Sequence, residues 1–465
     1  MSASPPRSNG PSPSTNLPEG SDDPDPNPGP ALAPPTGGAE PGASAAKPPA
    51  PGAAFVSTSQ PLFTPPFLRL LAMQAAYGFS FSMFFLLPKY LASTGEPAAR
   101  IGFVMAGFGV ACILTIPFLR GIVETLGRRG TLIAANLLLA TAAALFGLFD
   151  RPGLLAIPLR ASEGVTWTLM FSTAMALTAE LAPPQRLAQA IGLAGGASLV
   201  MNALAPAIGE PLADHLGYRS VFFVAALAAV GAAVLARRLP NAHAALPARP
   251  SAAANRHPPP GDTDVPGPAR RPGQVAIYTV FGAAGLAFGC LFAFLAPFAL
   301  DSGVHAVRAF FIGYTSAAIT VRVLGGRLSD RLGHRAVATA SLLLYGGAVA
   351  SAGVLAPFHL GVLGLAFGTA HGAAYPALMA LLVQGTPIGR RPRALGIANG
   401  AMSLGISAVA PAGVVAARFG YPALFALVGG LTSAAALLLL PRDRLALVAL
   451  RRFRSFASLW GGLAR

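Results

Sequence analysis

Long apolar runs follow one another along most of the chain, from Phe67 to about residue 440. Each run is close to the roughly 20 residues that a helix needs to cross the hydrocarbon core of a bilayer. We place twelve of them at residues 67–91, 100–119, 130–149, 153–180, 187–213, 219–238, 274–300, 307–326, 336–356, 359–384, 394–417 and 421–440. Because a helix satisfies its own backbone hydrogen bonds in lipid, the pattern predicts an all-α membrane protein with twelve transmembrane helices.

The second six runs repeat features of the first six at a nearly constant spacing. Ala205-Pro206 recurs as Ala410-Pro411, an offset of 205, and Gly217-Tyr218 recurs as Gly420-Tyr421, an offset of 203. Near-constant offsets indicate parallel repeats that are related by an axis along the membrane normal. We therefore expect two pseudo-symmetric six-helix halves.

Composition separates these halves from three polar regions. Residues 1–66 are rich in Pro, Ser, Gly and Ala, and such a segment buries too little apolar area to offset its ordering entropy. The stretch from Pro240 to Pro272 holds nine prolines and six charged residues, as expected of a flexible linker. The expected regions are a Pro-rich tail (1–66), an N-terminal half (67–239), a cytoplasmic linker (240–273), a C-terminal half (274–440) and a basic tail (441–465).

The basic residues predict the orientation of the chain in the membrane. The net charge is +16, but the arginines lie in short clusters at the ends of runs, which argues against nucleic-acid binding. With the N-terminus inside, the inner loops and the C-terminal tail hold 22 of the 33 basic residues, and the outer loops hold six. This asymmetry places both termini in the cytoplasm, and we expect a multi-pass protein of a bacterial cytoplasmic (inner) membrane.

One polar turn between two apolar runs is dense in glycine and charge. It reads Gly326-Arg-Leu-Ser-Asp-Arg-Leu-Gly-His-Arg335, and a weaker copy, Glu124-Thr-Leu-Gly-Arg-Arg129, lies 206 residues earlier. The decamer resembles the G-x-x-x-D-R-x-G-R-R loop signature of the major facilitator superfamily, found between helices 2 and 3 and again between helices 8 and 9. The first copy departs from it, with Glu124, Thr125 and Arg120 in place of the acid, the Arg and the leading Gly. The resemblance extends over residues 67–440 and implies the major facilitator fold.

The resemblance also implies a conformational latch at this turn. Asp330, Arg331 and Arg335 would form a charge relay against neighbouring helix ends on the cytoplasmic side. A carboxylate between guanidinium groups and helix termini is a contact that can break when two halves rotate. Ordinary capping of the loop is the alternative interpretation. The expected gating residues are Gly326, Asp330, Arg331, Gly333 and Arg335, with Glu124, Gly127 and Arg128 in the first half.

An ionisable pair inside the fourth run is the main candidate for proton or substrate binding. A charge inside a bilayer costs at least about 2.5–3.5 kcal/mol, so such residues are functional candidates by default. Glu163 is an acid well inside a run, and Arg160 precedes it by three residues, on the same helix face. We interpret Glu163 as a proton-accepting carboxylate whose proton affinity depends on Arg160 and on desolvation. The alternative is a self-neutralised pair that braces the helix. Arg160-Ala-Ser-Glu-Gly164 also resembles an R-x-x-x-G stretch of proton-coupled superfamily members.

The fourth and tenth runs carry matching residues. Glu163-Gly-Val-Thr-Trp167 matches His371-Gly-Ala-Ala-Tyr375 at an offset of 208. In the resembled fold, helices 1, 4, 7 and 10 line the central cavity, so Glu163 and His371 would approach one another across the substrate path. His371 would titrate near neutral pH as a proton partner or substrate contact, or it would be hydrogen-bonded between helices.

Other polar and aromatic side chains are further candidates for substrate contact. Gln74 and Tyr77 carry polar tips at helical spacing in the first run, and Asn202 lies in the fifth. Each would contact substrate or make a hydrogen bond between helices. Trp167 and Tyr375 would stack on a flat or cationic cargo, although packing explains both rings equally well.

A further stretch bears on the direction of transport. Ala205-Pro-Ala-Ile-Gly-Glu210 resembles the G-P-x-x-G-G stretch of exporters in the superfamily, with departures at Ala205 and Glu210. The chain contains no G-x-x-x-x-G-K-[ST] nucleotide-binding loop, and no nucleophile–base set or metal-ligand spacing lies within the runs. Its two cysteines, Cys112 and Cys290, lie in apolar runs and suggest no disulfide framework.

The sequence therefore predicts a secondary transporter rather than an enzyme. We expect proton-coupled export of a small organic or amphipathic molecule by alternating access, with the proton gradient as energy source and no cofactor. The expected partners are the small-molecule substrate, protons and the lipid bilayer, with no nucleic acid, and the expected state is a monomer. An uptake symporter or facilitator for a sugar, organic acid or amino acid is the alternative. A scaffold without transport activity that uses the Pro-rich tail is another.

Overall fold

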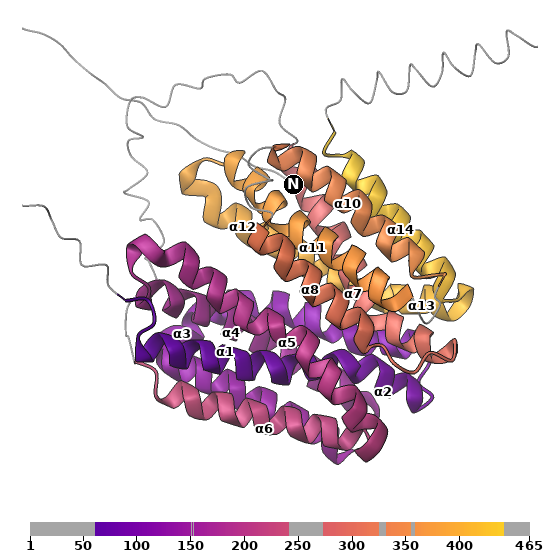
Figure 1. Ribbon diagram of the computed structural model, residues 1–465, viewed down its shortest axis with the longest axis horizontal. Coiled ribbons are helices and arrows are strands. Elements are labelled where there is room, and N and C mark those ends of the chain that lie inside the picture. Colours follow the sequence, from indigo (N-terminus) through magenta and orange to yellow (C-terminus); the bar gives the residue numbers. More distant parts are fainter. Residues whose placement is uncertain are drawn as a thin grey trace, which may run out of the picture. The chain divides into compact units, whose positions relative to one another are not determined.

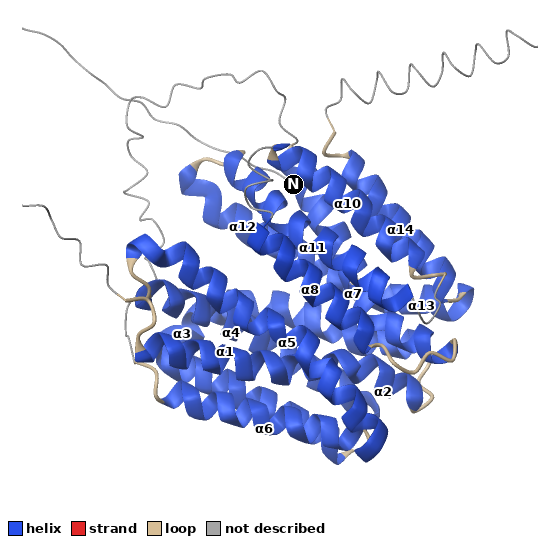
Figure 2. Ribbon diagram, viewed as in Figure 1, coloured by secondary structure: helices blue, strands red, loops and turns tan. Residues whose placement is uncertain are grey.

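The computed structural model describes residues 61–149, 151, 153–240, 273–324, 332–354 and 359–440, and all regular elements within these ranges are helices (Figure 2). They are α1 (Pro65–Met83), α2 (Leu87–Ser93), α3 (Ala98–Leu148), α4 (Ala156–Leu181), α5 (Leu187–Leu216), α6 (Tyr218–Arg237), α7 (Gln274–Asp301), α8 (Arg308–Leu324), α10 (His334–Ser351), α11 (His359–Gln384), α12 (Arg391–Ser407), α13 (Val409–Phe419) and α14 (Tyr421–Leu437). Four 3-10 turns accompany them: η1 (Phe84–Leu86), η2 (Gly153–Leu155), η3 (Pro184–Arg186) and η4 (Ile388–Arg390).

These helices form twelve consecutive segments in the described residues, in agreement with the sequence. α1, η1 and α2 form one segment, and α12 and α13 form another that is broken at Ala408. α3 holds two segments, because Gly127 leaves the helical conformation at φ 68° and ψ 167°. The sequence predicts a turn over residues 120–129, but in the structure the helix continues almost to Gly127. The turn is shorter than predicted because this one glycine adopts the positive φ without a Cβ penalty.

Seven of the described helical runs are long and apolar enough to cross a membrane by length and composition alone. One of the seven is the 51-residue α3, which accounts for two segments. Others fall below the criterion because they are short or polar: α14 has 17 residues, and α4 carries Arg160 and Glu163. A short or polar helix is accommodated in a bundle, where its polar side chains face neighbouring helices instead of lipid.

The same pairs of segments pack together in each half (Figure 1). In the first half α3 packs against α4 and α6, and α1 packs against α5 and α6. In the second half α8 packs against α11, α10 against α14, and α7 against α12 and α14. Segment by segment these pairs correspond, so the fold has the two pseudo-symmetric six-helix halves that the repeated residues predict. The expected regions 1–66, 240–273 and 441–465 lie mostly outside the described residues, and their boundaries stay predictions.

Short connections between successive segments give the bundle two ends. We call the end that holds residues 61–64, 238–240, 273 and 438–440 the linker end, and the end that holds the turns 94–97, 153–155 and 302–307 the distal end. The described contacts between the halves lie towards the distal end. α2 packs against α7, α5 against α8, and α3 against α12 and α13. The Phe85 ring lies 4.9 Å from the Phe292 ring and 5.5 Å from the Phe311 ring, centroid to centroid.

Gly102 lets the two halves touch through their backbones. A Cβ atom at Gly102 would lie 2.5 Å from the Val409 carbonyl oxygen and 3.0 Å from the Cα atom of Gly413. We expect Gly102→Ala to lower the free energy of unfolding by about 1–3 kcal/mol, the usual cost of overpacking a close contact. Thermal unfolding of purified protein measures this change. Gly192→Ala is the matched control, because a Cβ there meets nothing within 4 Å. Equal melting temperatures of the two variants would contradict the contact.

Candidate functional site

Arg160 and Glu163 form a buried ion pair on α4. The Arg160 side chain donates from Nη1 to Oε2 of Glu163, and the two residues are 6% and 0% exposed. The guanidinium carbon of Arg160 also lies 5.0 Å from the centroid of the Phe108 ring on α3. Within the described residues, Nε of Arg160 and Oε1 of Glu163 make no hydrogen bond. The pair is therefore neutral as a whole but keeps one donor and one acceptor for a further partner.

Gly164 brings this pair against α3. A Cβ at Gly164 would lie 3.0 Å from the Cβ atom of Ala111. The Cys112 thiol donates to the Gly164 carbonyl oxygen at 3.4 Å, which ties the two helices together at this level. The glycine that follows Glu163 in the sequence thus has a packing role, because a larger residue would push α4 away from α3.

Gln74 and Tyr77 add two more polar groups from α1. They are 6% and 3% exposed, and within the described part of the chain Nε2 of Gln74 and the Tyr77 hydroxyl have no hydrogen-bond partner. The Tyr77 hydroxyl faces Thr166 and lies within electrostatic range of Glu163 and Arg160. We call Tyr77, Arg160 and Glu163, together with Gln74 one helical turn before Tyr77, the polar cluster. A buried polar group without a partner is costly, so these groups are candidates for binding something polar or charged.

His371 belongs to a separate, aromatic environment in the second half. Its Nδ1 lies 3.4 Å from the Tyr345 hydroxyl. The rings of Phe288 and Tyr314 have centroids 5.3 and 5.9 Å from its own. The structure thus places Glu163 with Arg160 and His371 with Tyr345, in different halves. Their approach across a substrate path stays a prediction.

The remaining candidate residues already have neighbours within their own half. Asn202 on α5 accepts a hydrogen bond from Ser82 at 2.7 Å, which links α1 to α5. The Trp167 ring lies 5.0 Å from Phe81. The Tyr375 hydroxyl donates to Oδ1 of Asn399 at 3.2 Å. These contacts agree with the alternative interpretation, in which the three side chains pack or form hydrogen bonds between helices. Stacking of cargo on the Trp167 and Tyr375 rings stays a prediction.

The gating turn is described only in part. Gly326, Asp330 and Arg331 lie outside the described residues. Gly333 has φ 84°, and Nε of Arg335 donates to the carbonyl of Leu439, at the end of the last segment.

In the first half Gly127 has a positive φ in the same way, and Arg128 pairs with Glu180 at the end of α4. Glu124 forms an exposed ion pair with Arg120 at 2.6 Å. Both halves therefore use a basic residue after a positive-φ glycine to tie the turn to another segment end of the same half. Glu180 is not among the residues predicted from the sequence, and its position at the end of an apolar run was the available signal.

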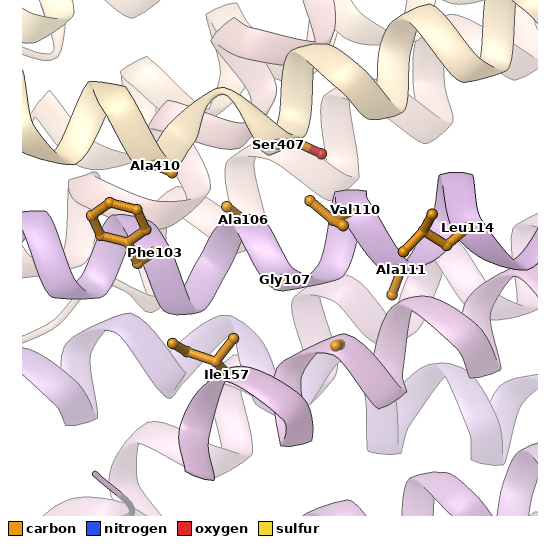
Figure 3. A pocket seen from close by; sticks show the side chains of 10 residues that line it. Phe103, Ala106, Gly107, Val110, Ala111, Leu114, Ile157, Ser407 and Ala410 are labelled. Atoms are coloured by element: carbon orange, nitrogen blue, oxygen red, sulfur yellow. The ribbon is translucent and has the colours of Figure 1, made fainter. Parts of the chain in front are cut away.

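An apolar groove of about 330 Å³ lies between α3, α4 and the α12–α13 break (Figure 3). Phe103, Val110 and Leu114 of α3 and Ile157 of α4 line it, and Ser407 supplies its single polar side chain. The Ser407 hydroxyl already donates to the Ser403 carbonyl at 2.9 Å. The groove thus offers apolar contact and no chemistry of its own.

Comparison with known proteins agrees with this arrangement. A family model described as Major Facilitator Superfamily matches residues 68–321 and 277–464. The solved structure of the nucleoside transporter NupG is similar at a TM-score of 0.61 and 14% identity, covering 81% of this chain and 98% of NupG. The human organic anion transporter MFSD10 (TETRAN) is similar at a TM-score of 0.56 and 19% identity, covering 81% of this chain and all of MFSD10 (100%). At these identities the likeness shows the fold alone. The chain belongs to the Major Facilitator Superfamily and is a multi-pass membrane transporter rather than an enzyme.

Proposed function

We propose that this chain exports a small organic molecule in exchange for protons, by alternating access. The observation that carries the proposal is the polar cluster, in which a fully buried carboxylate keeps Oε1 without a hydrogen bond within a membrane-spanning helix. An ion pair that only braces a helix would gain from full hydrogen bonding, whereas a proton-binding carboxylate needs an oxygen that no other donor occupies. Tyr77 adds a neutral donor near it, and Gln74 adds another one helical turn away on α1.

Glu163 is the proposed proton acceptor, and Arg160 is the group that makes protonation reversible. When Oε1 of Glu163 takes a proton, the ion pair with Arg160 becomes an ordinary hydrogen bond between a cation and a neutral acid. The local charge then changes from zero to +1, which alters the affinity of the polar cluster for cargo. Release of the proton restores the pair. Proton binding and cargo binding are thus coupled through the charge of the polar cluster, and exchange requires such a coupling.

The proposed cargo is amphipathic and carries a flat ring. Phe81, Trp167 and Phe171 form a continuous row of rings, with centroids 5.0 Å apart between the first two and 5.8 Å apart between the last two. In the second half the Phe288 and Phe292 rings stack at 4.2 Å. Aromatic faces bind flat or cationic groups, and the polar cluster beside the first row would bind a polar head.

The proposed orientation places both termini and the linker end in the cytoplasm of a bacterium, with the protein a monomer in the inner membrane. The basic residues of the linker-end loops support it. In this orientation the distal end faces outward, and the halves contact one another on the outer side. The structure then corresponds to an inward-facing state, in which Glu163 would release its proton.

A flux assay in proteoliposomes tests the exchange. The purified full chain is reconstituted, and radiolabelled uridine, p-aminohippurate and ethidium serve as probes of the nucleoside, organic anion and planar cation classes. Exchange with protons predicts accumulation of a probe when the lumen is more acidic than the bath, relative to protein-free liposomes. Accumulation only when the bath is more acidic would instead indicate an uptake symporter. Equilibration that ignores the gradient would indicate a facilitator, and either result would overturn the proposal.

A further inference from the structure

A second buried ion pair lies at the distal end, on α2 and α5, two helices that carry no residue of the polar cluster. Lys89 of α2 and Glu210 of α5 pair through Nζ and Oε1 at 2.6 Å, and their side chains are 4% and 1% exposed. Both belong to the first half. Taking two charges out of water is costly, and the cost is repaid only where further hydrogen bonds satisfy both groups.

The further hydrogen bonds of this pair come from the second half. Oε1 of Glu210 accepts from the backbone N–H of Val307 at 2.8 Å, and Oε2 accepts from that of Arg308 at 2.9 Å. The Arg308 guanidinium lies 3.9 Å from Oε2, and Nζ of Lys89 donates to the His305 carbonyl. α8 begins at Arg308, and the first N–H groups of a helix lack partners within it. The Glu210 carboxylate therefore caps α8 from the opposite half, where the helix dipole favours a negative charge.

We infer that Lys89, Glu210 and the start of α8 form an outer latch, which holds the distal ends of the halves together and dissociates each time that side opens. The inference rests on the alternating access proposed above. Opening would separate α5 from α8, and both charges would then exchange their partners for water. The Phe85 contacts with Phe292 and Phe311 lie on the same side and would part with it.

The linker end shows a different arrangement in the described residues. Arg128 pairs with Glu180, and Arg335 donates to Leu439, each within one half. Ionic contacts that cross between the halves are thus found at the distal end, which is expected of a state closed on that side. A latch of this kind is bistable because its partners are satisfied either by one another or by water.

The hydrogen bonds from the start of α8 to Glu210 distinguish a latch between the halves from an ion pair that acts within the first half alone. An ammonium group cannot accept a hydrogen bond, so a lysine at position 210 would face two backbone N–H donors that it cannot satisfy. Exchanging the two charges would restore the attraction between positions 89 and 210 but would unbind α8. An ion pair that only braces the first half would tolerate the exchange.

Distances between spin labels test the outer latch without any transport assay. Labels on Ser93 and Ser302 report the distal end, and labels on Gln185 and Ile388 report the linker end, in a background with Cys112 and Cys290 replaced by alanine. All four labelled positions are exposed. Double electron–electron resonance is measured on the full chain in detergent and in nanodiscs. The variants are Glu210→Gln, Lys89→Met, the neutral double variant Lys89→Met/Glu210→Gln and the exchange Lys89→Glu/Glu210→Lys.

We expect every one of these variants to shift the main distal distance from the short wild-type value to a longer one. The double variant leaves no unpaired buried charge, so it keeps the test valid if a single variant fails to fold. Glu96→Gln is the control, because the Glu96–Arg100 pair lies at the same end but is partly exposed, and it should leave the distances unchanged.

Each outcome of the distance measurements decides one part of the inference. A wild-type distal distance in the double variant would overturn the latch, and a wild-type distance in the charge exchange would overturn the part assigned to α8. If the distal distance lengthens while the linker-end distance stays fixed, the latch stands and the rocking motion of the proposed function fails.

Discussion

Proteoliposomes that contain Glu163→Gln are expected to lose accumulation driven by a pH gradient and to fall to the level of protein-free liposomes. Glutamine keeps an oxygen that accepts from Arg160, but it neither ionises nor takes up a proton in this pH range. Glutamine holds the polar cluster at the charge of its protonated state, so the variant should bind cargo with an altered affinity and still change conformation. Counterflow, the exchange of labelled for unlabelled probe at equal pH, should persist. The measurement is the initial rate of both processes for whichever of the three probes the wild type accumulates.

Glu96→Gln is the matched control for this result. It makes the same change of a paired glutamate, but the Arg100 and Glu96 side chains are 38% and 19% exposed and lie at the distal end, outside the polar cluster. Its gradient-driven rate should remain far closer to the wild-type rate. If Glu163→Gln accumulates probe as well as the control does, Glu163 has no part in coupling. If counterflow is also lost, the residue holds the fold or the cargo instead of the coupling proton.

Arg160→Met is expected to lower the free energy of unfolding by about 3–5 kcal/mol, the usual cost of removing one partner from a buried ion pair. Glu163 is fully buried, and the neutral Tyr77 hydroxyl near it cannot replace the charge that Arg160 supplies. The Phe108 ring also loses the cation above it. Thermal unfolding of the purified variant in detergent measures the change.

Two further variants separate charge from packing in this second prediction. Arg160→Met/Glu163→Gln buries no charge and should regain most of the lost stability. Arg120→Met removes the arginine of an exposed pair, whose contribution is at most about 1 kcal/mol, and should unfold close to the wild-type temperature. A double variant as unstable as Arg160→Met would show that arginine packing, rather than the unpaired carboxylate, sets the cost.

The sequence predicted the architecture because lipid imposes simple rules. Apolar runs near the length of a membrane crossing mark the segments, and the recurrence of Gly217-Tyr218 as Gly420-Tyr421 marks the two halves. The structure gives both glycines a positive φ at the junction of two helices, 78° and 83°. The repeat therefore records a backbone requirement, which is why it survives in both halves. The extent of helix around residue 127 was less predictable, since a single positive-φ glycine suffices to reverse the chain.

The candidate site was predictable where its partners are close in sequence. Arg160 and Glu163 lie three residues apart on one helix, and the structure pairs them as the spacing predicts. Lys89 and Glu210 lie 121 residues apart and meet only through the packing of α2 against α5 and α8. Lys89 is one of the six basic residues that the sequence assigns to the outer loops, and Glu210 is a departure from a glycine motif. Neither observation indicates a contact, because a tertiary pairing leaves no local pattern.

Simultaneous recording of lumenal pH and labelled cargo in the same proteoliposomes shows whether cargo is exchanged for protons. Vesicles are loaded with the accumulated probe and diluted into probe-free buffer at equal pH, with the membrane potential clamped by potassium and valinomycin. Proton exchange predicts that the lumen becomes more acidic as probe leaves, and that Glu163→Gln abolishes this pH change. A lumen that becomes more alkaline as probe leaves, or a lumenal pH that does not move, would contradict it.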